Sequence, residues 1–416
     1  MLRDSHSSSD AAHGGAGTDR VVSRISLARA FRDFGDGFVA VLLPVYLTIL
    51  GHTVFEVGLV SALALLGSAI LTLLVGAIGA RRDRRSLLLA ASLLMVASGV
   101  AYAAANEYWV LLVVACVGTI NPSAGSTSVF VPLEHTVLSR EVAAQVRTRT
   151  FAWYSLVGAL AGACGSLAAA TPQWLSSLGI EPLVALKLMF VAYSVLGVIG
   201  GTLYYGIRPQ PSEEGGRSRT ALGASRSIVY KLAALFSIDA FAGGFVVQSL
   251  LALWLFQRFD LSLSAASVIF FWTGVFAAFS FPVAAWLGSR IGLVNTMVFT
   301  HIPASLCLIA AAFTPTLGWT VAFLIARAVL GQMDVPARSS YVMAVVSPAE
   351  RPAAASVTAV PRSLAAAASP ALAGAMLAAG LQVWPLLVCG GLKIAYDLLL
   401  LVAFRRLKPP EERGAS

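Results

Sequence analysis

Charged side chains and cysteines are both scarce in this sequence. Only 12% of its 416 residues are charged, whereas soluble domains carry about 25%. The four cysteines stand far apart, at Cys116, Cys164, Cys307 and Cys389, so their spacing forms neither a CxxC motif nor a disulfide framework. The low charge excludes an ordinary soluble protein, and we interpret the cysteines as small packing residues rather than as ligands of a soft metal.

Sequence motifs for catalysis are also absent. The chain contains no phosphate-binding loop, no HExxH zinc motif and no nucleophile elbow. Its first 20 residues are rich in Ser, Gly, Ala and His and have no apolar core, so we expect no cleaved signal peptide. These absences argue against ATP hydrolysis and against an enzyme, and we expect neither a cofactor nor a bound metal.

Long apolar stretches, by contrast, fill almost the whole chain, of which 58% is hydrophobic. A stretch of about 20 apolar residues is long enough to cross a bilayer as an α-helix. Twelve such stretches lie near 31–50, 57–79, 87–105, 109–133, 150–170, 183–205, 229–256, 264–287, 293–313, 319–345, 354–379 and 384–404. We therefore predict an all-α integral membrane protein with twelve transmembrane helices.

The positive residues that give the chain its net charge of +9 are distributed as expected of a membrane protein. Arg and Lys gather in alternate connections, at the N-terminal stretch, 81–85, 140–149, 208–231, Arg290, 338–351 and 405–413, and Arg258 is the main exception. Cytoplasmic connections carry such an excess of cations. We therefore expect a multi-pass protein of the cytoplasmic membrane with both termini in the cytoplasm, and no binding of nucleic acid.

One long polar segment divides the twelve stretches into two sets of six. Residues 208–219 are rich in Pro, Gly and charge, a composition typical of a flexible linker. Residues 37–39 (Gly-Phe-Val) also recur at 244–246, which indicates a duplication. We predict a disordered cytoplasmic tail at 1–26, a six-helix half at 27–206, a cytoplasmic linker at 207–227, a second six-helix half at 228–405 and a tail at 406–416.

A glycine- and arginine-rich hairpin follows the second apolar stretch of each half. In the first half it contains Gly76, Arg81, Asp83, Arg84 and Arg85. The second half repeats it more weakly at residues 285–292, where Arg290 and Gly292 match. A hairpin that occurs once in each half indicates two pseudo-symmetric bundles, and we expect both hairpins to act at a gate.

Six helices on each side of a cytoplasmic linker, with this hairpin between the second and third helices, resemble the major facilitator superfamily over residues 27–405. In that family the hairpin reads Gly, three residues, Asp, Arg, one residue, Gly, Arg, Arg. The sequence departs from it at Ala80, which replaces the acid, and at Asp83, which replaces the second glycine. The resemblance implies a secondary transporter that alternates access to a central site, and it favours export over uptake.

The fourth and tenth predicted helices each carry a sequence of small, polar and proline residues that is typical of a helix break. Asn121-Pro122 lies in the fourth helix, and Gln332 and Asp334 precede Pro336 in the tenth. Irregular backbone in a membrane is tolerated beside a cavity, and interruptions at matching places in two repeats mark the binding site of a transporter. A plain proline kink is the alternative. We favour a role for both segments in the substrate cavity.

Charges inside the tenth helix are the strongest candidates for substrate binding. Arg327 lies about 13 Å from the outer end of this helix at 1.5 Å per residue, and Asp334 and Arg338 follow on roughly the same face. A buried guanidinium offers five donors to a carboxylate or phosphate. An internal ion pair of Asp334 with Arg327 or Arg338 is the alternative. We expect Asn121, Pro122, Arg327, Gln332, Asp334 and Arg338 to line the cavity.

Two deeper carboxylates are candidates for proton coupling. Asp36 in the first helix and Asp239 in the seventh occupy similar depths in the two halves, and a desolvated carboxylate can exchange protons near neutral pH. Arg32 is the alternative structural partner of both, of Asp36 at i,i+4 and of Asp239 across the halves. Asp36 and Asp239 are therefore either proton carriers or members of ion pairs.

Several other charges have simpler explanations. Arg29 and Asp33 form an i,i+4 pair, as do Lys393 and Asp397, and we expect both pairs to be structural. Glu134 has Arg147 and Arg149 as candidate partners, and Arg362 is expected at the cytoplasmic start of its helix.

We therefore predict a monomeric secondary transporter that moves a small solute through a lipid bilayer, coupled to protons. The alternative is a membrane sensor or scaffold that keeps the fold without transport. Neither tail is long enough to form a soluble sensing domain, which argues against that alternative.

Overall fold

The computed structural model describes residues 5–78, 82–123, 128–142, 144–209, 222–223, 225–347 and 350–405. The regular structure in these ranges is entirely α-helical. Its helices are α1 Ser5–Ile49, α2 Val54–Ile78, α3 Arg84–Ala104, α4 Tyr108–Val117, α5 Phe130–Glu141, α6 Ala144–Ala168, α7 Thr171–Ser177, α8 Pro182–Tyr205, α9 Arg226–Gly244, α10 Gln248–Phe259, α11 Leu263–Ile291, α12 Leu293–Phe313, α13 Leu317–Gly331, α14 Asp334–Val345, α15 Arg351–Ala378 and α16 Trp384–Phe404.

These helices form twelve passes, because four passes consist of two helices in series. The divided passes are the fourth (α4 and α5), the fifth (α6 and α7), the seventh (α9 and α10) and the tenth (α13 and α14). In the described residues, eight helical segments are long and apolar enough to cross a membrane. The prediction of an all-α membrane protein with twelve transmembrane passes is confirmed.

Helix caps repeat between the two halves. The first, fifth and eleventh passes end at Gly51, Gly179 and Gly380, with φ of 87°, 92° and 77°, and the seventh ends at Asp260 with φ of 48°. Glycine adopts this left-handed conformation without a Cβ clash and closes a helix in the Schellman motif. Passes 1 and 7, and passes 5 and 11, therefore end alike, as expected of a duplicated bundle.

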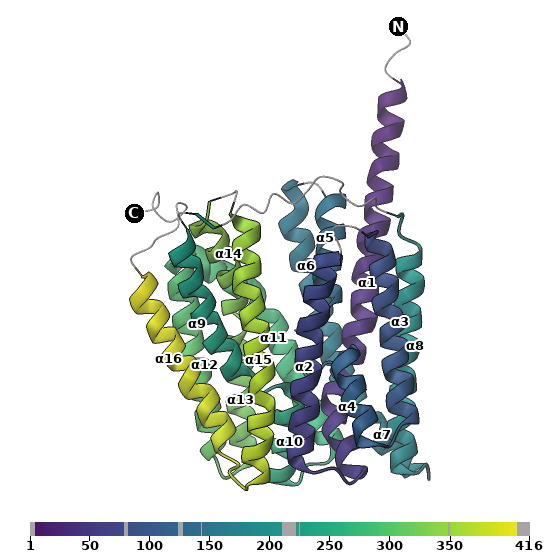
Figure 1. Cartoon of the computed structure of the whole chain (residues 1–416), viewed down its shortest axis with the longest axis vertical. Coiled ribbons are helices and arrows are strands. Elements are labelled where there is room, and N and C mark those ends of the chain that lie inside the picture. Colours follow the sequence, from purple (N-terminus) through teal and green to yellow (C-terminus); the bar gives the residue numbers. More distant parts are fainter. Residues whose placement is uncertain are drawn as a thin grey trace.

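Both termini lie at one end of the bundle, which we call the terminal end, and the opposite end is called the far end (Figure 1). Within the first half, α1 packs against α6 and α8, and within the second half α9 packs against α15 and α16. The two halves meet mainly where α2 contacts α15 and where α6 contacts α11. This arrangement leaves room for a site between the halves.

The N-terminal segment differs from the disordered tail that we expected at 1–26. Helix α1 begins at Ser5 and its first part extends beyond the bundle (Figure 1). Arg24 donates a hydrogen bond to the carbonyl of Gly206, and Ile25 is completely buried. Packing of this part of α1 favours helix in the residues before it, because extending a formed helix is easier than starting one. Residues 210–221, 224 and 406–416, which hold most of the expected linker and the C-terminal tail, lie outside the described residues.

Candidate functional site

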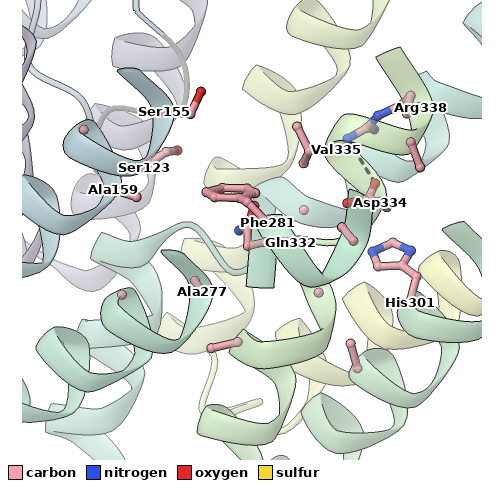
Figure 2. A pocket seen from close by; sticks show the side chains of 18 of the residues that line it. Ser123, Ser155, Ala159, Ala277, Phe281, His301, Gln332, Asp334, Val335 and Arg338 are labelled. Carbon is pink, nitrogen blue, oxygen red and sulfur yellow. Dashed lines mark ion pairs between the residues drawn. The ribbon is translucent and has the colours of Figure 1, made fainter. Parts of the chain in front are cut away.

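A cavity of about 2400 Å³ lies between the two halves. Ser123 lines it from the first half, and in Figure 2 Phe281 of α11 lies between Ser123 and the Asp334 and Arg338 side chains of α14. Its wall also includes Asp19, Arg290 and Arg405 at the terminal end. The cavity therefore opens at the terminal end of the bundle.

Small residues close the far end. A Cβ atom added to Gly58 of α2 would lie 2.7 Å from the Cα atom of Gly374 in α15, so the two backbones are in direct contact. One helical turn after Gly58, the hydroxyl of Ser61 in α2 lies 3.1 Å from the hydroxyl of Ser249 in α10. The halves are thus held together at the far end by contacts that contain no ion pair among the described residues.

The breaks of the fourth and seventh passes are hydrogen-bonded to each other across the halves. The backbone N–H of Ser249, at the start of α10, donates to the carbonyl of Pro122 at 3.1 Å. The Asn121 side chain accepts from the N–H of Ser123 at 2.8 Å, and Asn121 is buried. Of these residues Ser123 lines the cavity, whereas Asn121 and Pro122 lie behind its wall. The seventh-pass break, between Gly244 and Gln248, was not predicted from the sequence.

The tenth pass breaks where its sequence predicts. Helix α13 ends at Gly331 and α14 begins at Asp334, and Gln332 between them is exposed to the cavity. The Arg338 guanidinium lies 3.0 Å from the Asp334 carboxylate, one turn further along α14 (Figure 2). The pair at this break is therefore Asp334 with Arg338, and not Asp334 with Arg327.

Asp239 is the centre of a buried ion network in the second half. Its Oδ2 atom lies 2.8 Å from Arg338 Nη1, and its Oδ1 atom lies 2.6 Å from Lys393 Nζ. The alternative pairing of Asp239 with Arg32 is wrong, because Arg32 pairs with Glu134 in its own half at 2.9 Å. Lys393, which we expected to be structural, also lines the cavity, so α16 contributes to the site.

His301 of α12 extends this network and was missed in the sequence. Its Nδ1 atom lies 3.1 Å from Asp397 and its Nε2 atom lies 3.2 Å from Lys393 Nζ. An ammonium group only donates hydrogen bonds. Nε2 is therefore the acceptor, and we assign the proton of a neutral imidazole to Nδ1, which donates it to Asp397. The expected i,i+4 pair of Lys393 with Asp397 is therefore wrong, because the His301 ring lies between the two side chains and contacts both.

Two arginines on the cavity wall have no anionic partner within ion-pair distance in the described residues. Arg327 makes no hydrogen bond to a described side chain and packs beside Gly331. Arg362 lies eleven residues into α15 rather than at its start, and its Nε atom is buried without a hydrogen bond. The expectation that Arg362 sits at the helix start was wrong, because the predicted stretch from 354 already places it eight residues inside the helix, and α15 begins at Arg351.

The first half holds a second buried cluster around Glu134. Its carboxylate accepts hydrogen bonds from the hydroxyls of Tyr154 and Tyr204, and it pairs with Arg32. We expected the arginines that follow in α6 to bind Glu134, but the completely buried carboxylate binds Arg32 of α1, Tyr154 of α6 and Tyr204 of α8 instead. Three donors from three different helices therefore fix α5 within the first half.

Asp36 has a different environment from Asp239. It accepts a hydrogen bond of 3.1 Å from the Tyr193 hydroxyl and is 1% exposed. Arg29 pairs with Asp33 at 3.0 Å as predicted, and Arg32 Nε lies 3.2 Å from Asp33 rather than beside Asp36. Asp36 lies behind the cavity wall, which Arg29 and Asp33 form at this place.

The first hairpin joins α2 to α3 at the terminal end. Gly76 lies in the last turn of α2, and Arg81 lies outside the described residues. Asp83 caps α3 by accepting the N–H of Ser86 at 3.2 Å, so the acid that replaces the family's glycine serves as a helix cap. Helix α3 begins at Arg84, the next residue.

Arginines of both hairpins pack on aromatic rings. The Arg85 guanidinium lies 4.4 Å from the ring centre of Tyr205 in α8, and that of Arg290 lies 5.7 Å from Trp286. Gly292 turns the chain from α11 into α12 with φ of 86° and ψ of 160°. The Arg85 contact thus joins α3 to α8 at the terminal end, whereas the Arg290 contact lies within α11.

A family model described as Major Facilitator Superfamily matches residues 25–331 and 232–416. An uncharacterized membrane protein of Saccharomyces cerevisiae is 22% identical in an alignment 405 residues long, which covers 88% of this chain and 90% of that protein.

Two solved transporters have a similar fold. A bacterial homologue of the human lysosomal transporter Spinster, in an inward-facing and occupied conformation, has a TM-score of 0.69 and 18% identity, with 92% of this chain and 94% of that chain covered. The nucleoside transporter NupG has a TM-score of 0.70 and 14% identity, with coverage of 92% and 99%. At these identities the likeness concerns the fold and leaves the solute open.

Proposed function

Because the chain belongs to the major facilitator superfamily of membrane transporters, we propose that it is a secondary transporter that moves a small solute by alternating access, as a monomer. The observation that carries this proposal is the cavity of about 2400 Å³ between the halves, open at the terminal end and closed at the far end. A cavity with one open end is the arrangement that rocking of two bundles around a fixed site requires.

The chemistry of the far-end contact supports a reversible closure. Gly58 and Gly374 meet through backbone atoms, and Ser61 and Ser249 through one hydroxyl contact. Parting such surfaces separates no ion pair of the described residues. The charged networks lie within each half instead, where they keep each bundle rigid while the two halves move.

The terminal end is proposed to face the cytoplasm. Arg140 ends α5, Arg226 begins α9, and Arg290 and Arg351 lie at the same end of α11 and α15. Cations gather in this way on the cytoplasmic side of a membrane. The conformation described is then the one open to the cytoplasm, and the protein resides in the cytoplasmic membrane.

Proton coupling is proposed to use Asp36 or Asp239. Asp36 is buried beside the Tyr193 hydroxyl without a cation at ion-pair distance in the described residues, and such burial disfavours a charge. Asp239 is held by Arg338 and Lys393, so a proton on Asp239 would release both cations. Export remains the favoured direction on the basis of the resemblance described above.

Solute flux into proteoliposomes, with and without a pH gradient, tests this function. We expect flux of at least one solute from a broad panel, stimulated by the gradient, and loss of that stimulation in Asp36→Asn or Asp239→Asn. Asp260→Asn is the matched control, because Asp260 lies in a far-end turn and asparagine tolerates its left-handed conformation. Absence of flux for the whole panel would favour the sensor or scaffold, and gradient-stimulated flux in both variants would exclude these carriers.

A further inference from the structure

The cavity wall carries an excess of positive charge. Of the described residues that line it, eight are Arg or Lys and four are Asp. Near the middle of the second half, Asp239 and Asp334 compensate two of these cations, Arg338 and Lys393, at distances of 2.6–3.0 Å. The charges left over in this region are those of Arg327 and Arg362.

Arg327 lies near the middle of the membrane without a counter-ion among the residues that the structure describes. It is ten residues from the start of α13, which corresponds to about 15 Å, or half of a hydrocarbon core of about 30 Å. An unpaired charge at that depth is costly and marks a functional site by default. Arg327 lines the cavity, so a solute that enters the cavity can reach its guanidinium.

Arg362 adds a second uncompensated charge on the same side of the cavity. Its Nε atom is buried and makes no hydrogen bond. Arg338, Asp239 and Asp334 are its charged neighbours, and the two acids already pair with other groups. Arg362 is thus a third cation beside Arg338 and Lys393, whose charges are already compensated by the two acids. A negatively charged ligand could compensate the charge of Arg362.

Apolar side chains complete the cavity. Phe270 and Phe281 of α11 line it together with Leu308 and Leu324, and Phe281 projects between the halves (Figure 2). Such surfaces bind the apolar body of a ligand, while a few polar groups fix its orientation.

We propose that the cavity binds organic anions, with the acidic group of the ligand on the Arg327 guanidinium, Arg362 as the second cation, and an apolar body against the phenylalanines. This inference rests on the proposed function and names the chemical class of its solute. Carboxylates and phosphates share the geometry that a guanidinium recognises, and the test separates them.

Equilibrium binding to the full chain in detergent, at constant ionic strength, tests the inference without any need for transport. The probes are benzoate, phenyl phosphate and decanoate, with benzamide as the neutral and benzylamine as the cationic analogue. We expect titration calorimetry to detect at least one anion and neither analogue. The stronger of benzoate and phenyl phosphate identifies carboxylate or phosphate as the preferred group.

Arg327→Gln should weaken binding of the anion by about tenfold or more, because it removes charge-assisted hydrogen bonds. Arg327→Lys should lie between Arg327→Gln and the unaltered protein, and Arg362→Gln should weaken binding independently. Arg258→Gln is the matched control, since Arg258 is exposed at the end of α10 and outside the cavity wall.

Binding of no anion, or equal binding of benzamide or benzylamine, would overturn the inference. So would unchanged binding in Arg327→Gln and, if that variant does not fold, unchanged binding in both Arg327→Lys and Arg362→Gln. Flux of a neutral solute that is unchanged in Arg327→Gln would support the transporter and contradict the anion site. Anion binding without flux of any solute would support the anion site and contradict the transporter.

Discussion

Lys393 of α16 donates a 2.6 Å hydrogen bond to Asp239 of α9, and so joins the last pass of the bundle to the seventh. The same carboxylate binds Arg338 of α14 at 2.8 Å. One buried anion therefore positions three helices of the second half, and two of its neighbours are cavity-lining cations. Removing the Asp239 carboxylate therefore takes an ion-pair partner from both Lys393 and Arg338.

Asp239→Asn should lower the free energy of unfolding by about 3–5 kcal/mol, because it leaves the half-buried Lys393 without its counter-ion and removes one of the two partners of the buried Arg338. Lys393→Met should cost less, since Asp239 keeps Arg338. The double variant should cost less than the sum of the two, as residues in direct contact do not act independently. Unfolding by added SDS in detergent, followed by tryptophan fluorescence, gives these values. Additive losses would contradict the assigned pair.

The hairpin between α11 and α12 depends on the backbone of Gly292. Its φ of 86° and ψ of 160° lie in a region that is essentially limited to glycine, and another residue there costs roughly 1–3 kcal/mol. Gly292→Ala should therefore lower the melting temperature in detergent. Gly76→Ala is the matched control, since a Cβ atom at Gly76 meets no heavy atom within 4 Å. Equal melting temperatures for the two variants would contradict the requirement for glycine.

Glu350 makes the stability of the terminal end depend on pH. It lies between α14 and α15 and accepts hydrogen bonds from Gly223 and Ser225 before α9. The Ser225 hydroxyl and the Gly223 N–H lower the pKa of Glu350 below its ordinary value of 4.5. A lowered folded-state pKa stabilises the fold above the ordinary value, and this contribution is lost as the pH falls through the folded-state pKa.

Glu350→Gln should therefore melt at a lower temperature than the unaltered protein near about pH 6, and the difference should shrink towards about pH 3.5. Thermal unfolding in detergent across this range measures it. Glu181→Gln is the control, because the Glu181 side chain makes no capping hydrogen bond to α8. A difference that stays constant over the whole range would show that Glu350 does not act through its charge.

Local patterns in the sequence predicted several local features. Apolar stretches predicted the twelve passes, and the sequence around Gln332 predicted the break of the tenth. The i,i+4 rule identified the Arg29–Asp33 pair, but Lys393 and Asp397 bind Asp239 and His301 instead of each other. Helical geometry places i,i+4 residues on one face, and the neighbouring helices decide whether they pair.

Contacts between distant helices could not be predicted in the same way. Asp239 meets Lys393 across 154 residues, and the tertiary packing that brings them together leaves no periodic signal. His301 stood alone in an apolar stretch, so nothing in the sequence pointed to its role. Arg362 was misplaced because its depth along the helix was not counted from the predicted start at 354, which lies close to the observed start at Arg351.

The far-end contact of Gly58 with Gly374 allows a direct test of the alternating cavity. A Cβ atom at Gly58 would lie 2.7 Å from the Gly374 Cα and from the Pro370 carbonyl oxygen, and backbone atoms cannot turn aside as a flexible side chain would. Overpacking of this kind costs about 1–3 kcal/mol. Gly58→Ala should therefore destabilise the closed far end and shift the population by roughly 5- to 150-fold towards the state open there.

Labelling of Gln332→Cys by an impermeant maleimide, in a background without the native cysteines, measures this shift. Gln332 is exposed to the cavity, so its rate of labelling from the terminal end reports how often that end is open. We expect Gly58→Ala to slow labelling from the terminal end and to speed it from the far end. Gly391→Ala is the matched control, because a Cβ atom there meets nothing within 4 Å. If Gly58→Ala and Gly391→Ala label equally fast from both ends, the glycine contact does not control access to the cavity.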